Sequence, residues 1–205
     1  YCEIFRAVIC LHNNRAWRVA MYIGKVILKN IRGFEYLECD LAREDGSYAG
    51  WTVFTGDNGS GKSALLKAIA VALTGKDTAR VLQPSFSRWI KDGTKDDESS
   101  IQLEIVGCKE DDTFTEKGRT TQQSFPAKIV LKNGSKETTL DVSIPSAKPN
   151  KLSIPQRTIW SLDAKGWFSC GYGPFRRVFG ASPEAVRQMV APATERFVTM
   201  FQEAA

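Results

Sequence analysis

The pattern of hydrophobic and polar positions predicts short strands that lead into one long helix. Segments rich in β-branched and aromatic residues indicate strands over residues 22–29, 34–41 and 51–55. After the third strand and a glycine-rich stretch, hydrophobic residues occupy nearly every face of residues 63–73. We therefore expect a buried helix there, with Gly75 in the position of its C-cap.

Further along the chain, longer polar stretches separate the hydrophobic segments. The three prolines between residues 143 and 156 indicate a loop or a sheet edge. A helix is expected from Ser182, with Pro183 at its first position. Further strands are expected, of which the first two would pair as an antiparallel hairpin, over residues 101–106, 127–132, 158–162 and 167–172.

The first twenty residues show neither strand alternation nor a helical stripe, and the pattern changes at Met21. We expect residues 1–20 to be a leader or upstream translation outside the domain, and residues 21–205 to be the amino-terminal part of a domain that is incomplete here. A structured extension over residues 1–20 remains the alternative.

Composition narrows the function classes. The chain has 205 residues, of which 42% are hydrophobic and 25% charged, as expected for a globular domain rather than a disordered chain. Five cysteines without a C-x-x-C pair and a single histidine offer no zinc site. The longest apolar run, 64–73, is shorter than the roughly 18 residues of a membrane span, so we expect a cytoplasmic protein without a membrane partner. A net charge of +5 suits a nucleic-acid or nucleotide partner, but a solvated basic surface explains it equally.

The glycine-rich stretch carries the clearest chemical signal. Gly56, Gly61, Lys62 and Ser63 match G-x-x-x-x-G-K-[ST], the phosphate-binding loop also known as Walker A. Glycines allow consecutive backbone N–H groups to curl around a phosphate, and Lys62 adds a positive charge for the β- and γ-phosphates. Ser63 opens the helix, where its hydroxyl can ligate Mg²⁺. The predicted ligands are therefore a nucleotide and Mg²⁺.

The surroundings of this loop resemble the SMC, SbcC and RecF-like ABC-type ATPases. The resemblance rests on K-N-I-R-G-F at residues 29–34 and on G-x-N-G-x-G-K-S at residues 56–63. It implies an α/β fold, namely a P-loop NTPase with the amino-terminal lobe of an ABC-type head and an antiparallel β-hairpin subdomain. It also implies ATP as the nucleotide, with Arg32 reaching toward the phosphates and Asn58 beside the γ-phosphate.

The residues expected to bind the nucleotide are the loop, the start of the helix and the strand-end arginine. They are Gly56, Asp57, Asn58, Gly59, Ser60, Gly61, Lys62, Ser63, Ala64 and Arg32, with Ser63 as the metal ligand. Phe34 and Tyr36 lie on the strand next to the loop, where they either flank the adenine or belong to the core.

A second resemblance is narrower. G-W-F-S-C-G-Y-G-P-F-R-R at residues 166–177, with R-F-V-T-M-F at 196–201, is similar to predicted bacterial ATP-binding proteins with an AAA-type, RecF-like domain. Some relatives of that group are fused to nucleases or belong to phage-defence systems. Gly171, Gly173 and Pro174 are expected to form a tight turn after a buried aromatic strand, and the Arg176-Arg177 pair contacts phosphate or DNA, or is simply solvated.

The ABC-type family also has a signature motif, a Walker B carboxylate pair and a switch histidine, which the chain does not show. Residues 159–163 (IWSLD) imitate a Walker B strand, but Ala164 stands where the catalytic glutamate is needed. We therefore expect these 205 residues to bind Mg-ATP without turnover, and a complete protein to hydrolyse ATP as a homodimer of heads, in DNA repair or phage defence. Two alternatives stay open: a nucleotide-gated DNA-binding or nuclease-coupled module, and a P-loop kinase for a small molecule.

Overall fold

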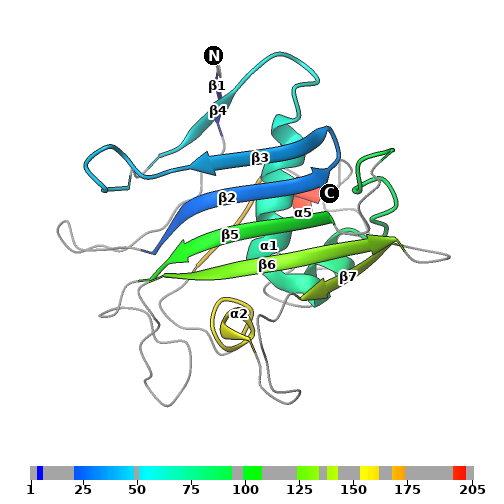
Figure 1. The fold of residues 1–205 in the computed structure, drawn as a ribbon. Coiled ribbons are helices and arrows are strands. Elements are labelled where there is room, and N and C mark those ends of the chain that lie inside the picture. Colours follow the sequence, from blue (N-terminus) through cyan, green and yellow to red (C-terminus); the bar gives the residue numbers. More distant parts are fainter. Residues whose placement is uncertain are drawn as a thin grey trace, which may run out of the picture.

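A computed structural model describes residues 4–6, 21–48, 51–93, 99–107, 124–133, 138–142, 153–161, 168–173 and 196–201. Its elements, shown in Figure 1, are β1 (Ile4–Arg6), β2 (Tyr22–Ile31), β3 (Phe34–Asp40), β4 (Val53–Thr55), α1 (Lys62–Leu82), β5 (Ser99–Val106), β6 (Ser124–Asn133), β7 (Thr138–Val142), α2 (Ile154–Arg157) and α5 (Val198–Phe201).

A five-stranded antiparallel sheet forms one layer, with the strand order β3-β2-β5-β6-β7. Helix α1 lies across one face of this sheet (Figure 1). The expected antiparallel hairpin of the 101–106 and 127–132 segments is confirmed as the β5–β6 pair. Strand β7, which the sequence pattern did not reveal, extends the sheet beyond β6.

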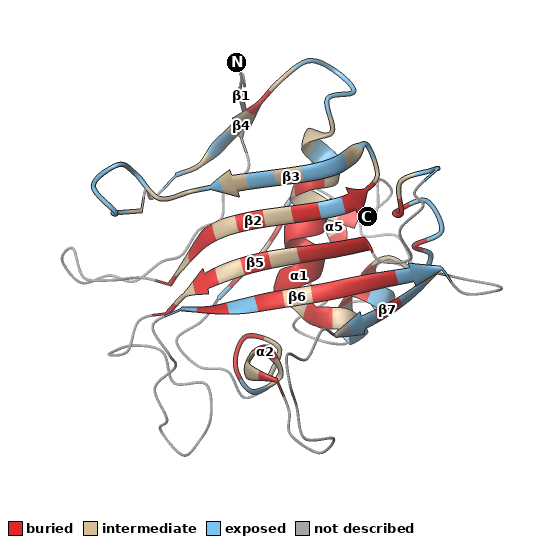
Figure 2. Ribbon diagram, in the orientation of Figure 1, coloured by how far each residue is buried: buried red, intermediate tan, exposed pale blue. Residues whose placement is uncertain are grey.

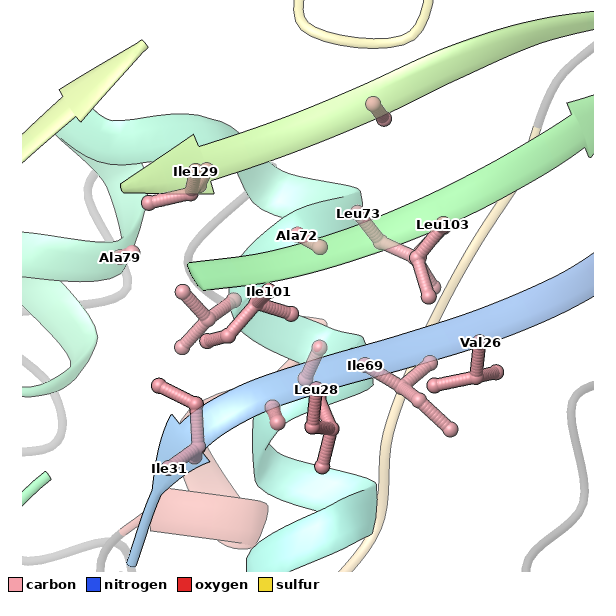
Figure 3. Close-up of a cluster of buried hydrophobic side chains, with 14 of the residues drawn as sticks. Val26, Leu28, Ile31, Ile69, Ala72, Leu73, Ala79, Ile101, Leu103 and Ile129 are labelled. Atoms are coloured by element: carbon pink, nitrogen blue, oxygen red, sulfur yellow. The ribbon is translucent and has the colours of Figure 1, made fainter. Parts of the chain in front are cut away.

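The core lies between the sheet and α1. Val26 and Leu28 of β2 pair with Leu103 and Ile101 of β5, so all four side chains share the face that α1 covers. Ile69, Ala72 and Leu73 of α1 lie against that face in Figure 3, and Figure 2 shows the buried band running along β2, β5 and β6. Each such fully buried aliphatic side chain contributes about 1.5–3 kcal/mol to folding.

Helix α1 follows the glycine loop as expected, beginning at Lys62, one residue before Ser63, and is interrupted at Gly75, which has φ 79° and ψ 169°. Gly75, the expected C-cap, is thus a break inside α1, which continues to Leu82 and has Gln83 as its C-cap. The indole of Trp160 packs against Gly75, and its Nε1–H donates a hydrogen bond of 2.8 Å to the carbonyl oxygen of Ala72. The break therefore receives a side-chain partner from a segment about ninety positions away.

The expected strand over residues 158–162 is wrong. Ser153 and Gln156 form a capping box that starts the short helix α2, which has Pro155 in its first turn. Thr158 follows in a turn, and its hydroxyl donates to the carbonyl of Ile154 at 2.7 Å. The β-branched residues that suggested a strand, Thr158 and Ile159, are buried here without forming a strand, and the half-buried Trp160 packs against α1.

The expected strand over residues 167–172 is also wrong for the described residues 168–173, which form neither helix nor strand. The expected tight turn of Gly171, Gly173 and Pro174 extends outside the described residues and stays a prediction. Phe168 is 52% exposed rather than buried. A Cβ atom at Gly173 would lie 2.0 Å from the carbonyl oxygen of Thr199, so glycine is required here by the close approach of α5.

Strand β1 pairs antiparallel with β4, the strand that leads into the glycine loop. The assignment of residues 1–20 to a segment outside the domain stays a prediction. Among the described residues, no helix is long and apolar enough to cross a membrane. Several interpretations concern positions outside the described residues, namely most of residues 1–20, Asp163, Ala164, Pro174, Arg176, Arg177 and the helix from Ser182.

Candidate phosphate-binding site

The glycine loop connects β4 to α1 and faces solvent. Thr55, the last residue of β4, is buried, whereas residues 57–60 are exposed. Gly59 and Gly61 have φ angles of 86° and 92°, in the left-handed region that side chains disfavour. The backbone thus makes the curled path that the sequence motif predicts.

Gly61 has a second, steric reason to be glycine. A Cβ atom at this position would lie 2.6 Å from Cζ of Phe34, the first residue of β3. Nothing lies within 4 Å of the corresponding Cβ position at Gly59. The aromatic ring of Phe34 therefore packs on the last residue of the loop and joins the start of α1 to the β2–β3 turn.

This arrangement bears on the two aromatic residues considered for the adenine. Phe34 is half-buried and packs against the core, which agrees with the alternative that it is a core residue. Tyr36 is 61% exposed, and its hydroxyl donates to the carboxylate of Glu38. Neither observation tests an adenine contact.

Lys62 turns its ammonium group back into the loop. Its Nζ donates to the carbonyl oxygens of Gly56 at 2.6 Å and Asp57 at 2.5 Å, and to Oγ of Ser60 at 3.3 Å. These partners are neutral, so the positive charge of Lys62 adds to the partial charge at the N-terminus of α1. No side chain caps that terminus, and its first turn contains no acidic residue. Both features favour an anion at this position.

Ser63 is exposed in the first turn of α1. The described residues contain no group of three or more His, Cys, Asp or Glu side chains that could hold a metal ion. A Mg²⁺ ion at this loop would therefore take its oxygens from the Ser63 hydroxyl, the phosphates and water, as Mg²⁺ often does in nucleotide sites. The donor set fits a metal that arrives with its nucleotide.

Arg32 is placed differently from the loop residues. It has φ 49°, and its guanidinium carbon lies 4.8 Å from the ring centroid of Trp89. Its Nε is buried without a hydrogen-bond partner, and burial lowers the pKa of Arg32 below its usual value. Among the described residues no carboxylate pairs with Arg32, and no hydrogen bond joins it to the loop 56–64. The structure thus brings Lys62, Ser60 and the loop carbonyls together, with Arg32 on a neighbouring turn.

The sequence patterns did not predict two contacts at this site. The contact of Phe34 with Gly61 joins positions that no short motif relates, and the same holds for Arg32 and Trp89. Only the tertiary fold brings each pair together.

A model of the family described as the AAA domain matches residues 25–166, which is more than half of the chain. The chain belongs to the AAA domain family. Membership indicates an ATP-binding P-loop ATPase domain, in agreement with the nucleotide that the loop predicts. The matched range contains the glycine loop, Arg32, Trp89 and the five-stranded sheet except for residues 22–24 at the start of β2.

This AAA domain is also similar to the Septu protein PtuA of Bacillus mycoides (strain KBAB4). The two are 29% identical over 90 residues, which is 43% of this chain and 12% of that protein. The chain therefore spans only a small part of the length of this relative.

Proposed function

We propose that this AAA domain binds Mg-ATP at residues 56–64 and that the complete protein hydrolyses it to switch between conformations. The observation that carries the proposal is the Lys62 ammonium group inside the curled loop, above an uncapped helix N-terminus. A bound phosphate group would replace neutral carbonyl partners by charged oxygens, which form stronger hydrogen bonds with an ammonium group.

Each loop residue has a distinct part in this proposal. The backbone N–H groups around Asn58, Gly59 and Ser60 surround the β-phosphate, and Lys62 reaches the β- and γ-phosphates. Ser63 would hold Mg²⁺, which would neutralise charge on the phosphate oxygens. Positioning and charge neutralisation of this kind are the main requirements of phosphoryl transfer.

Arg32 completes the proposed site as the residue that distinguishes ATP from ADP. It is half-buried and carries a positive charge without a carboxylate partner among the described residues. A half-buried charge of this kind is stabilised when an anion arrives. Because ADP lacks the γ-phosphate, a contact from Arg32 to that group would strengthen only ATP binding.

The resemblance of K-N-I-R-G-F and of the loop to RecF- and SMC-like ATPases supports the wider parts of the proposal. These are ATP-dependent pairing of two such domains in the complete protein, DNA as a partner, and a role in DNA repair or phage defence.

The proposal is tested by Lys62→Ala, with ATP binding measured by isothermal titration calorimetry in the presence of Mg²⁺. We expect a roughly 10- to 100-fold loss of ATP affinity, because a charge-assisted contact of about 1.5–3 kcal/mol is removed. Lys76→Ala is the matched control, since Lys76 lies on the same helix beyond the break at Gly75. Equal ATP affinities for folded Lys62→Ala and Lys76→Ala would contradict the proposal.

Arg32 is tested in the same assay by comparing ATP with ADP. Arg32→Ala is expected to weaken ATP about 5- to 100-fold and to leave ADP nearly unchanged, the range for a hydrogen bond to a charged group. Arg88→Ala, at an exposed arginine of the neighbouring loop, is the control for net charge. Equal losses for ATP and ADP in Arg32→Ala would show that the γ-phosphate is bound by another residue.

A further inference from the structure

Trp89 is a buried tryptophan next to Arg32, and the proposed function does not yet assign it a role. Trp89 is 1% exposed, and the guanidinium carbon of Arg32 lies 4.8 Å from its ring centroid. Phe86 supports the indole from the other side of the same loop, with ring centroids 4.9 Å apart. Trp89 thus presents a buried aromatic ring to the guanidinium of Arg32.

The contact with this ring leaves at least one N–H of the guanidinium, that of Nε, without a hydrogen-bond partner. A guanidinium is planar, so it can lie on an aromatic ring with its face and donate hydrogen bonds from its edge at the same time. In the structure the Nε–H of Arg32 is shielded from water and has no acceptor. The ring contact therefore holds the guanidinium in place while its Nε–H still lacks a hydrogen-bond partner.

The backbone fixes the same pair independently of the side chains. The N–H of Arg32 donates to the carbonyl of Trp89 at 2.7 Å, and the N–H of Lys91 donates to the carbonyl of Asn30 at 3.0 Å. Between these bonds, Ile31 and Ile90 form an antiparallel bridge. The end of β2 and the loop after α1 therefore move as one unit.

That unit touches the phosphate loop through Phe34. Phe34 follows Arg32 by two residues, and its ring packs on Gly61. Two residues of extended chain span about 7 Å, and an arginine side chain covers a similar length. Arg32 is thus within reach of a phosphate held by the loop.

We propose that Trp89 is a positioning residue, which holds the guanidinium plane of Arg32 so that its N–H edge binds the γ-phosphate of ATP. The inference rests on the proposed function, since it names the residue that orients Arg32 in that site. Trp89 itself touches no nucleotide. Its effect must therefore appear in the preference for ATP over ADP and depend on an aromatic ring.

The test measures ATP and ADP dissociation constants for Trp89→Leu and Trp89→Phe at one magnesium concentration. Trp89→Leu keeps an apolar side chain in the core but removes the ring, and we expect ATP to bind about three- to tenfold more weakly while ADP changes less than twofold. Trp89→Phe restores a ring face and is expected to recover most of the ATP preference.

Phe86→Leu is the matched control for packing. Phe86 is 3% exposed in the same cluster, but its ring contacts Trp89 and not Arg32. The proposal requires Phe86→Leu to keep the wild-type ratio of ATP to ADP affinity, even if the melting temperature of this variant is lower than that of the wild type. It is overturned if Trp89→Leu and Phe86→Leu change that ratio equally, or if Trp89→Leu weakens ATP and ADP to the same extent.

A second measurement needs no nucleotide affinity. The ring current of Trp89 is expected to shift the Arg32 side-chain Nε–H proton upfield in an NMR spectrum. Addition of ATP, but not ADP, should move this signal, because a guanidinium N–H that forms a hydrogen bond to phosphate is deshielded. An unshifted signal in wild type, or one that Trp89→Leu leaves in place, overturns the stacked geometry. If wild type binds no ATP, or binds it equally well after Lys62→Ala, the proposed function itself fails and this inference fails with it.

Discussion

Gly61 permits a quantitative test of how the phosphate loop is held, through the substitution Gly61→Ala. The new methyl group meets two obstacles. The backbone has φ 92°, and the Cβ atom would lie 2.6 Å from Cζ of Phe34, a separation at which the ring or the loop must move. Gly59→Ala is the matched control, because Gly59 has φ 86° but nothing within 4 Å of its Cβ position.

The two substitutions separate backbone strain from overpacking. A non-glycine residue in the left-handed region costs about 1–2 kcal/mol, which both variants share. Overpacking costs a further 1–3 kcal/mol, roughly, and applies only at Gly61. We therefore expect Gly59→Ala to destabilise the domain by about 1–2 kcal/mol and Gly61→Ala by about 2–5 kcal/mol.

The assay is urea unfolding of both variants together with Phe34→Leu and the double variant Gly61→Ala/Phe34→Leu. Removal of the Phe34 ring should relieve the overpacking but not the strain, so the double variant is expected to regain about 1–3 kcal/mol relative to additive behaviour. Strictly additive effects, or equal stabilities for Gly59→Ala and Gly61→Ala, would refute the contact between Phe34 and Gly61.

Three further predictions concern the rest of the fold. Gly173→Ala places a Cβ atom 2.0 Å from the carbonyl oxygen of Thr199 and should destabilise the domain by about 3 kcal/mol; an unchanged urea midpoint would contradict the close packing. Trp160→Phe keeps a ring against α1 but loses the hydrogen bond to Ala72. We expect the free energy of unfolding to fall by about 1 kcal/mol and backbone amide hydrogen exchange around the helix break to become faster. A chain that begins at Met21 should melt within a few degrees of the full 205 residues, whereas a large drop would place residues 1–20 in the folded core.

Elements with a regular hydrophobic periodicity or a local sequence motif could be predicted from the sequence. The predicted strands over 22–29 and 34–41 differ from β2 and β3 by at most two residues at any end. Their residues alternate between the α1-facing side and the open side, which is the pattern that periodicity detects. The start of α1 was predictable for a different reason, since the glycine loop motif itself specifies a helix after the loop, where α1 begins at Lys62.

Elements whose side chains pack against distant segments were not predictable in this way. Ile159 and Trp160 carry strand-like side chains, yet Trp160 serves as a partner for the carbonyl of Ala72 at the break in α1. The local signal that would have corrected the strand prediction was the capping box of Ser153 and Gln156, three positions apart. Tertiary contacts decided the remainder, because hydrophobic content alone does not separate a buried turn from a buried strand.

The candidate site likewise contains residues that the sequence predicts and contacts that it does not predict. The sequence motif predicts which residues form the loop, because the requirements for glycine and lysine there are local. The contact of Arg32 with Trp89 depends instead on the tertiary fold, because Trp89 lies 57 positions later and reaches Arg32 only after β2 and the loop following α1 have paired. The spacing of residues in the chain carries no information about that contact.

The segment K-N-I-R-G-F, first noted as a family resemblance, has a structural explanation in this fold. Asn30 and Arg32 both have φ near 50°, a conformation that asparagine tolerates well and that arginine adopts only when its surroundings compensate for the strain. Two backbone hydrogen bonds compensate for the strain: the carbonyl of Asn30 accepts one from the N–H of Lys91, and the N–H of Arg32 donates one to the carbonyl of Trp89.

The two residues with positive φ turn the chain so that Phe34 reaches Gly61 of the phosphate loop. The motif therefore places Arg32 against a buried tryptophan, on the same turn whose Phe34 packs on the phosphate loop, which explains why backbone strain is concentrated at this turn.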